Sequence, residues 1–366
     1  MEKKQPGNTG QKKTVIAELS VDNVKNTLRR DFEELKQFFL DEERLRKLEN
    51  MKPFKRSLLV AWWLLKSMFL RLTVTRRLLL VLGMTLLMIN LSWVTKGADI
   101  RFDSYFKILG GLVFLFILML ELKDKLLAHD ELAAGRQVQL ALMPEASPKI
   151  PGWDVWLYSM PANDVGGDLV DYIPVDKDRF GLVLGDVAGK GLPAALFMAK
   201  LQATLRALVT EFDSAAELGD KINEIFHRDI ISKSFASLVY LELEPNSGRI
   251  SLLNAGHPPP LIIREGKIQP TGKGNIGLGI RADTRYKTKD ISLEQEDFLI
   301  VYSDGVSEAQ DEKDEFFGTE RLLRILSETA DLSAVEVGEK ILTAVENFVG
   351  EAPRHDDLSL MILQRR

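Results

Sequence analysis

One stretch of the sequence, FGLVLGDVAGKGLPAALFMAK from Phe180 to Lys200, has residue types that could take part in phosphate or metal chemistry. An apolar run ends in Gly-Asp, a glycine-rich turn follows, and the pattern then becomes helical. A nucleotide-binding P-loop needs a Gly, four residues and then Gly-Lys followed by Ser or Thr, whose hydroxyl reaches Mg²⁺. Here only three residues separate Gly185 from Gly189, and Gly191 stands where the hydroxyl should be. The stretch therefore favours Asp186 as a metal ligand over a P-loop.

Further aspartates stand at the borders of other β-like runs. Asp168 follows Val-Gly-Gly and opens one run, Asp304 ends another and has Gly next to it, and Asp356 and Asp357 precede a third. Carboxylates that converge on one end of a β-structure repel one another unless a cation neutralises them. The chain has no Cys and only four His, so the available oxygen ligands favour Mg²⁺ or Mn²⁺ over zinc.

Each of these residues also has a plainer interpretation. A single Asp beside Gly is usually a turn residue or a helix cap, but four such sites in matching contexts favour a shared metal site. Lys190, in the Gly-Lys-Gly turn, would contact phosphate or remain a solvated loop residue, and the sequence leaves both open. His257, crowded by prolines in NAGHPPPLI, is interpreted as a structural residue of a turn between strands.

Two apolar segments before this region predict a transmembrane hairpin. Leu78–Val94 and Ile108–Leu120 contain no charged residue, and the predicted spans are 78–94 and 105–122. A pair of buried helices in a soluble domain is the alternative. Seven Lys or Arg and no acid between Lys52 and Arg77 place the N-terminus, and hence the C-terminal domain, in the cytoplasm. We therefore expect a multi-pass protein of the inner (cytoplasmic) membrane.

The N-terminal region, residues 1–77, is basic, with 18 basic and 10 acidic side chains. Such a region beside a membrane span suits anionic lipid. Nucleic-acid binding is not expected, because there is no aromatic-interleaved basic patch and no zinc-finger spacing. Ser57–Leu72 contains Trp62 and Trp63 among basic residues, which is typical of an interfacial helix, and a re-entrant segment is the alternative. The absence of Cys excludes disulfides and thiol catalysis.

Residues 121–144 are predicted to form a helical linker between the membrane and the C-terminal domain. Apolar residues recur there at approximately helical spacing until Pro144 stops the pattern, namely Leu122, Leu126, Leu127, Leu132, Val138 and Leu142. We expect the helix to pair with a copy of itself, so that the protein is a homodimer, and a passive spacer is the alternative.

From Trp153 onward the pattern changes to short β-like runs with two pairs of helices among them. The predicted strands are WDVWLYS, DLVDYIPV, RFGLVLGD, FASLVYLEL, RISLLNAG, PLIIR, DISL, DFLIVYSD and DLSLMILQ. The predicted helices are residues 192–210, 215–230, 319–328 and 334–349. Paired helices between groups of strands do not suit a repeating βαβ sheet. They predict an α+β fold over residues 145–366, a central antiparallel β-sandwich flanked by helices.

Five motifs, in order, resemble the bacterial SpoIIE/RsbU branch of the PPM (protein phosphatase 2C-like) serine/threonine phosphatases. They are PANDVGGDLVDY, LVLGDVAGKGLPAALFMA, NAGHPPPLI, VYSDGVSEA and HDDLSLMIL, and the resemblance covers residues 137–364. It implies a β-sandwich flanked by helices, with two Mn²⁺ or Mg²⁺ ions bound at one end of the domain.

The resemblance also implies a role for each aspartate. Asp186 would bridge both ions, helped by the backbone carbonyl of Val187. Asp304 and Asp356 would complete the coordination of one ion. Asp168 would hold the other ion directly or through water. Asp357 is a further candidate ligand.

The implied reaction is hydrolysis of phosphoserine or phosphothreonine on a STAS-domain protein, an anti-sigma-factor antagonist. Two cations can lower the pKa of a bound water from 15.7 towards about 7 and clamp the phosphoryl oxygens, so no Ser or Cys nucleophile is needed. The arginine that eukaryotic relatives use to hold phosphate has no counterpart in PANDVGGD, which leaves the metals and Lys190. The segment 121–143 resembles the family's regulatory entry helix and is expected to gate the metal site.

Two other functions compete with this one. A catalytically silent docking module at the membrane would be expected to have lost some of the aspartates, and all are present. A nucleotide-dependent kinase or ATPase is disfavoured because the Gly-Lys-Ser/Thr sequence is missing.

Overall fold

The structure is a computed structural model, and it describes residues 52–88, 92–95, 98–101, 103–229, 235–329 and 332–366. The chain divides into two compact units, Met1–Leu126 and Leu127–Arg366, and each is described by itself. Most of the predicted basic region, residues 1–51, lies outside the described residues, as do residues 89–91 of the first predicted span.

The described part of the N-terminal unit consists of helices and one small pair of strands. Helices α4 and α5 span Pro53–Arg71 and Val74–Met88, strands β1 and β2 span Ser92–Thr95 and Ala98–Arg101, and α6 begins at Asp103. The segment expected to be interfacial is thus helical, whereas its position at a membrane stays a prediction. The end of the first predicted span differs from expectation, because Ser92–Val94 lie in strand β1. The aromatic Trp93 and the β-branched Val94 are residue types that favour strands.

Helices α5 and α6 approach each other closely within this unit. A Cβ atom at Gly110 of α6 would lie 3.0 Å from the carbonyl oxygen of Gly83 in α5, so a larger residue there would require the two helices to shift apart slightly. Near the start of α5, Arg76 donates hydrogen bonds to Glu121 and Asp124 of α6 at 2.7 and 2.5 Å. Small residues at the contact and a charge cluster at its end are typical of a tightly packed helical hairpin.

Helix α6 runs without interruption from Asp103 to Leu142. The predicted linker is therefore helical over residues 121–142. Leu122, Leu126, Leu127 and Val138 are exposed on it. The apolar pattern read from the sequence is thus largely a surface feature of this chain.

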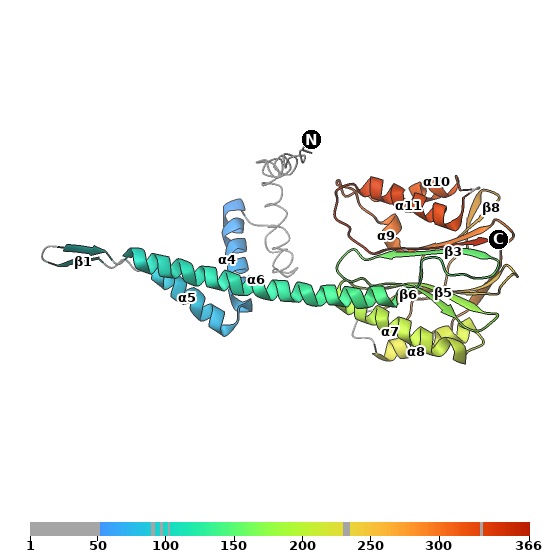
Figure 1. Cartoon of the computed structure of the whole chain (residues 1–366), viewed down its shortest axis with the longest axis horizontal. Coiled ribbons are helices and arrows are strands. Elements are labelled where there is room, and N and C mark those ends of the chain that lie inside the picture. The colour runs from blue at the N-terminus through green and yellow to red at the C-terminus, as the bar shows by residue number, and fades with distance from the viewer. Residues whose placement is uncertain (1–51, 89–91, 96–97, 102, 230–234, 330–331) are drawn as a thin grey trace, which may run out of the picture. The chain divides into compact units, whose positions relative to one another are not determined.

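The C-terminal unit is built on two five-stranded antiparallel sheets (Figure 1). In spatial order, the first contains β10 (Thr288–Ser292), β7 (Arg249–Ala255), β6 (Ala236–Leu243), β5 (Phe180–Val187) and β4 (Asp168–Pro174). The second contains β3 (Trp153–Met160), β12 (Leu358–Arg365), β11 (Phe298–Tyr302), β8 (Leu261–Arg264) and β9 (Lys267–Pro270). All nine predicted strands are found; β9, with the polar sequence KIQP, was not predicted.

A pair of helices covers the outer face of each sheet, as Figure 1 shows. The helices are α7 (Leu192–Leu208, continued by the 3₁₀ turn Val209–Glu211), α8 (Ala215–Asp229), α10 (Gly318–Leu326) and α11 (Ala334–Val349), with a short α9 (Asp304–Ser307) after β11. One apolar core fills the space between the sheets, and another lies under each helix pair. The prediction of an α+β fold with a helix-flanked antiparallel sandwich is confirmed.

By length and composition, one helical stretch of the described chain could cross a membrane, Leu192–Glu211. This stretch is α7 with its 3₁₀ turn. Its buried residues, among them Leu201 and Leu205, belong to the core against the first sheet. We interpret it as a core helix, since such helices meet the same criterion.

Candidate metal centre

The predicted aspartates come from both sheets and meet at one end of the sandwich. Asp168 begins β4 and Asp186 lies near the end of β5, and the two are directly opposite each other in the antiparallel pairing. Asp304 follows β11, and Asp356 comes shortly before β12, which pairs with β11. Strand register therefore determines which carboxylates are neighbours.

Burial and like charge act together on Asp186. Burial, and then the negative charges of Asp304, Asp356 and Asp357, raise the pKa of Asp186 to about 7. The pKa of Asp304 is also raised, by burial first and then by Asp356. Carboxylates in this situation are stabilised in their charged form by a bound cation.

Asp168 is the most deeply buried member of the group, and its Oδ2 atom has no hydrogen-bond partner. Burial, followed by the charge of Asp186, raises its pKa well above the usual value, and the hydroxyls of Ser359 and Ser303 act in the opposite direction. A buried carboxylate oxygen without a partner is costly, and a metal ion is one group that would satisfy it.

Space beside the Val187 carbonyl depends on a glycine. A Cβ atom at Gly167 would lie 2.9 Å from the carbonyl oxygen of Val187 and 3.7 Å from Oδ1 of Asp186. The donors present are carboxylate and carbonyl oxygens, which suit Mg²⁺ or Mn²⁺. Among the described residues no three His, Asp or Glu side chains already form a metal cage. The interpretation of these residues as a site for Mg²⁺ or Mn²⁺ therefore rests on the types of donor atom and on the unpartnered oxygen of Asp168.

The Asp357 carboxylate is engaged by backbone amides. Its Oδ1 accepts from the Ala162 amide at 2.8 Å, and its Oδ2 accepts from Gly167 and Asp168 at 2.6 and 3.3 Å. A Cβ atom at Gly166 would overlap with the same carboxylate, so this glycine is needed for the approach. The geometry favours a role in positioning the Asp168 loop, and the role of Asp357 as a metal ligand stays a prediction.

Lys190 lies at the exposed edge of the centre. Its Nζ donates to the carbonyl of His355 at 2.6 Å and lies 3.9 Å from Oδ2 of Asp356. The turn that presents it needs Gly189 and Gly191, which have φ values of 125° and 69°. Lys190 is therefore tied to the loop that carries Asp356.

A contact that the sequence did not predict joins helix α6 to the Asp168 loop. The buried Gln139 amide donates to the Gly166 carbonyl at 2.9 Å and accepts from the Gly166 amide at 3.1 Å. Gln139 lies seven residues after Leu132 and three before Leu142, so it is a polar residue on the helix face of these two half-buried leucines. A polar residue at such a position is the feature of the sequence from which a buried polar contact could have been predicted.

The end of α6 is held by a second set of contacts. The carbonyl of Leu142, the last helical residue, accepts from Gln202 of α7 at 2.9 Å and from Arg206 at 3.4 Å. Arg206 also makes two hydrogen bonds, at 2.7 and 2.8 Å, to the fully buried Asp171 of β4. Helix α6 is thus fastened to the strand that begins with Asp168.

His257 joins the two sheets behind the centre. Its Nε2 donates to the Tyr302 carbonyl of β11 at 3.1 Å, and its Nδ1 therefore accepts from the Ser237 hydroxyl of β6 at 2.7 Å. Burial lowers the pKa of His257 to about 4, so the ring is neutral. These contacts agree with the structural role expected from the sequence.

Two packed antiparallel sheets, a helix pair on each outer face and acidic residues at one end are the features of a PP2C-like phosphatase fold. The chain resembles the SiaA-PP2C domain of Pseudomonas aeruginosa with a TM-score of 0.58, at 18% identity, over 66% of this chain and 99% of that one. This likeness shows the fold.

The chain belongs to the SpoIIE family, because the family model "Stage II sporulation protein E (SpoIIE)" matches residues 176–366. It is 26% identical to phosphoserine phosphatase RsbU of Bacillus subtilis over 65% of this chain and 70% of the relative. It is 27% identical to protein IcfG of Synechocystis over 64% of this chain. The chain spans only 41% of the length of IcfG.

Protonation of His257 is expected to destabilise the fold as pH falls. Its pKa is about 4 in the folded chain and about 6.5 when unfolded, so the unfolded state binds more protons between these values. Through this group, the free energy of unfolding of the wild type should fall by up to about 3 kcal/mol between pH 6.5 and 4. Urea unfolding of wild type and His257→Asn at several pH values measures the difference, with the exposed His129→Asn as control. Parallel pH profiles for wild type and His257→Asn would contradict the assignment.

Proposed function

We propose that this chain is a metal-dependent protein phosphatase that hydrolyses phosphoserine or phosphothreonine on a regulatory protein. The observation that carries the proposal is the buried, unpartnered carboxylate oxygen of Asp168 opposite Asp186, at the point where both sheets end. Support also comes from the similarity to the relative named phosphoserine phosphatase RsbU.

Each residue of the centre has a proposed task. Asp168, Asp186, Asp304, Asp356 and the carbonyl of Val187 would hold two Mn²⁺ or Mg²⁺ ions. When bound, such ions supply the Lewis acidity that activates water and neutralises phosphoryl oxygens.

Two neighbouring residues would assist the centre. Asp357 keeps the Asp168 loop in place through three backbone amides. Lys190, which already lies at the exposed edge, would contact the phosphate.

The substrate is proposed to be a phosphorylated STAS-domain protein, an anti-sigma-factor antagonist. The support is the family and the similarity to RsbU. A catalytically silent docking module is less well supported, because every predicted carboxylate is present and the most buried one still lacks a partner for one oxygen.

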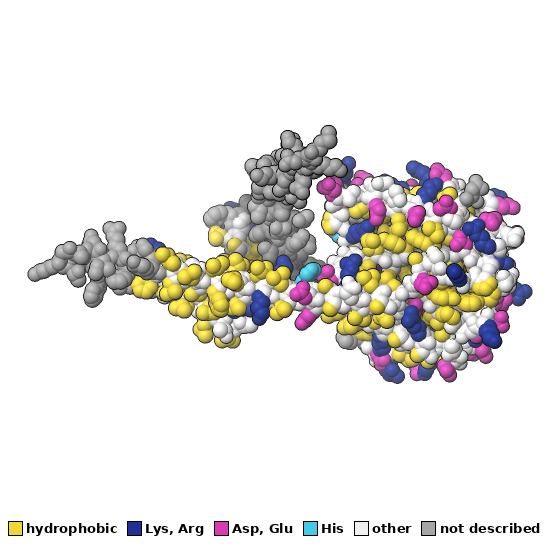
Figure 2. Space-filling view, in the orientation of Figure 1, with side chains coloured by type: hydrophobic (Ala, Val, Ile, Leu, Met, Phe, Trp, Pro, Cys, Tyr) yellow, Lys and Arg dark blue, Asp and Glu magenta, His cyan; other side chains and the backbone are white. Residues whose placement is uncertain are grey.

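We also propose that the N-terminal unit spans the inner membrane, with the N-terminus and the phosphatase domain in the cytoplasm and α4 on the lipid surface. Large hydrophobic side chains are exposed along the helices of this unit (Figure 2). They include Leu78, Val81, Leu82, Met84 and Leu87 in α5 and Ile108, Leu112, Leu115, Phe116, Leu118 and Met119 in α6. A lipid environment would remove this apolar surface from water.

A homodimer through the 121–143 helix is proposed on the exposure of Leu122, Leu126, Leu127 and Val138. Pairing with a second copy would bury this surface. The same helix carries Gln139, so a change in its packing would reach the Asp168 loop. In this proposal the helix regulates the metal centre.

Metal-dependent turnover is the first expected result. The full chain should hydrolyse p-nitrophenyl phosphate with Mn²⁺ or Mg²⁺ and lose activity with a chelator. Asp186→Asn and Asp304→Asn should each lower kcat/KM by about a hundredfold or more, because loss of even outer-shell partners costs 10–100-fold. The exposed Asp290→Asn serves as the matched control. Activity that survives in both variants would contradict the assignment, and calorimetric metal binding without turnover would favour the docking module.

Gln139→Leu should weaken the metal centre. The substitution leaves the Gly166 amide and carbonyl without hydrogen-bond partners, and each unsatisfied group lowers the stability of the folded state by about 1–3 kcal/mol. We expect the Mn²⁺ concentration that gives half-maximal activity to rise about tenfold. Titration of p-nitrophenyl phosphate turnover with Mn²⁺ measures this concentration. Gln137→Leu, exposed on the same helix, is the control. An unchanged titration in Gln139→Leu would remove the proposed coupling.

Single-cysteine variants test the membrane arrangement cleanly, because the chain has no cysteine. In intact cells, an impermeant maleimide should label Thr95→Cys but label the exposed Ser247→Cys only after lysis. Under oxidation in the same membranes, Leu126→Cys should form a disulfide-linked dimer. Labelling of Ser247→Cys from outside, or a soluble chain, would refute the topology, and monomeric Leu126→Cys would count against the helix pairing.

A further inference from the structure

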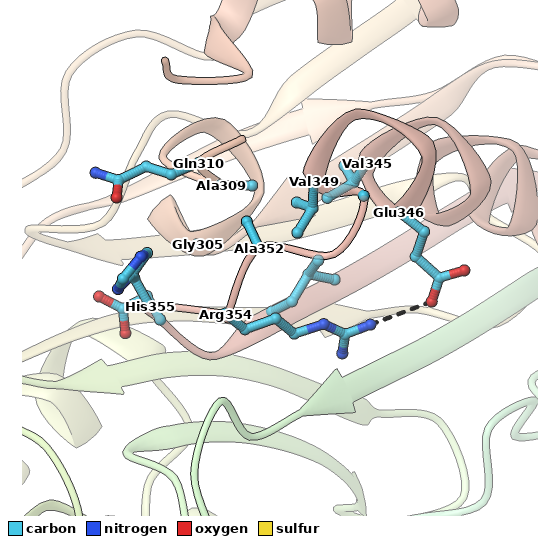
Figure 3. A pocket seen from close by; sticks show the side chains of 12 residues that line it. Gly305, Ala309, Gln310, Val345, Glu346, Val349, Ala352, Arg354 and His355 are labelled. Atoms are coloured by element: carbon cyan, nitrogen blue, oxygen red, sulfur yellow. Dashed lines mark hydrogen bonds and ion pairs between the residues drawn. The ribbon is translucent and has the colours of Figure 1, made fainter. Parts of the chain in front are cut away.

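A hollow of about 260 Å³ lies directly beside the candidate metal centre. Its walls come from α9 and the residues after it, from the C-terminal part of α11 and from the loop that leads to β12 (Figure 3). Two of its lining residues belong to the surroundings of the centre, since Asp356 is a predicted ligand and Gly305 follows Asp304. The hollow and the centre therefore share a wall.

The lining is half apolar and half polar, and its polar part includes Gln310, His355 and the Asp356 carboxylate on the side of the centre. The apolar part consists of Ala309, Val345, Val349, Ala352 and Leu358. Arg354 and Glu346 also line it and pair with each other at 3.2 Å, as the dashed line in Figure 3 shows. A charged ligand group would gain little from a charge pair that is already satisfied, whereas an apolar group would leave water.

The size of the hollow suits one large apolar side chain. A cavity of about 150 Å³ lined by aliphatic residues accepts benzene, so a hollow of about 260 Å³ has room for Leu or Phe. A phosphorylated residue bound at the carboxylates would place its chain neighbours nearby, since one extended residue spans about 3.3–3.6 Å. Side chains flanking the phosphorylated residue are thus within reach of the hollow.

We propose that this hollow is a substrate subsite that takes an aliphatic or aromatic side chain flanking the phosphorylated Ser or Thr. It would select among phosphoproteins by an apolar contact beside the reaction, while the carboxylates act on the phosphate common to all of them. This inference rests on the proposed phosphatase function and adds the chemistry of the residue next to the phosphate.

The test uses the full chain and phosphoserine heptapeptides that carry Phe, Leu, Gly or Asp at each flanking position in turn. For the wild type, kcat/KM at one flanking position should be at least about tenfold higher for Phe or Leu than for Gly. Inhibition constants against p-nitrophenyl phosphate are measured for the same peptides, so that a slowly hydrolysed peptide still reports its affinity.

Two filling variants, Ala352→Leu and Ala309→Leu, should abolish that preference. Both alanines line the hollow and are only partly buried, and either variant suffices if the other fails to fold. Their kcat/KM for p-nitrophenyl phosphate should stay within about twofold of wild type, because that substrate has no flanking residue. Ala207→Leu, exposed on α7, is the control and should keep the peptide preference.

The outcomes separate the subsite from the phosphatase function. Equal kcat/KM and inhibition constants for all peptides, or a preference that survives in the folded filling variants, would overturn the subsite. Absence of any p-nitrophenyl phosphate turnover by the wild type would instead contradict the proposed function, and the subsite would fall with it.

Discussion

Like charges buried against one another at the open end of the sandwich impose the main constraint on this molecule. Asp168 and Asp186 face each other across one strand pair, and burial together with neighbouring carboxylates raises the pKa of both. Such an arrangement opposes folding unless another group compensates for it. The large apolar cores of the sandwich hold the carboxylates together, and a bound cation would relieve the repulsion. If the proposed ions bind here, they would stabilise the folded domain as well as complete the centre.

The loop that carries Asp168 is held from two directions. Asp357 binds its amides from the segment before β12, and Gln139 binds Gly166 from helix α6. These two residues are separated by most of the sequence of the C-terminal unit, yet both act on the same few backbone groups. A shift of α6 would change one set of these contacts and leave the other intact. This arrangement gives a physical basis for the proposed control of the centre by the helix.

Recognition of a substrate would divide between charge and shape. The phosphate would meet the carboxylate-bound ions and Lys190, which lies on the exposed edge beside Asp356. In the proposed function, these groups would act on any phosphate monoester. Selection of one phosphoprotein must then come from contacts away from the phosphate, and binding energy from such contacts can be used to position the reacting group. The hollow next to Asp356, with its apolar side formed by Ala309, Val345, Val349, Ala352 and Leu358, is suitably placed for that purpose.

The sequence by itself determined most of the fold and the identity of the acidic residues, because strand and helix periodicities are local and each aspartate stands at a recognisable border. The short elements β9 and α9 were not predicted, because β9 has four residues and α9 has one helical turn, too few for a period to appear. Only the tertiary structure decided that Asp357 binds the amides of a loop some 190 residues earlier, that Gln139 reaches Gly166, and that a hollow lies beside Asp356. The physical reason is that these contacts depend on how sheets and helices pack, which no local pattern encodes.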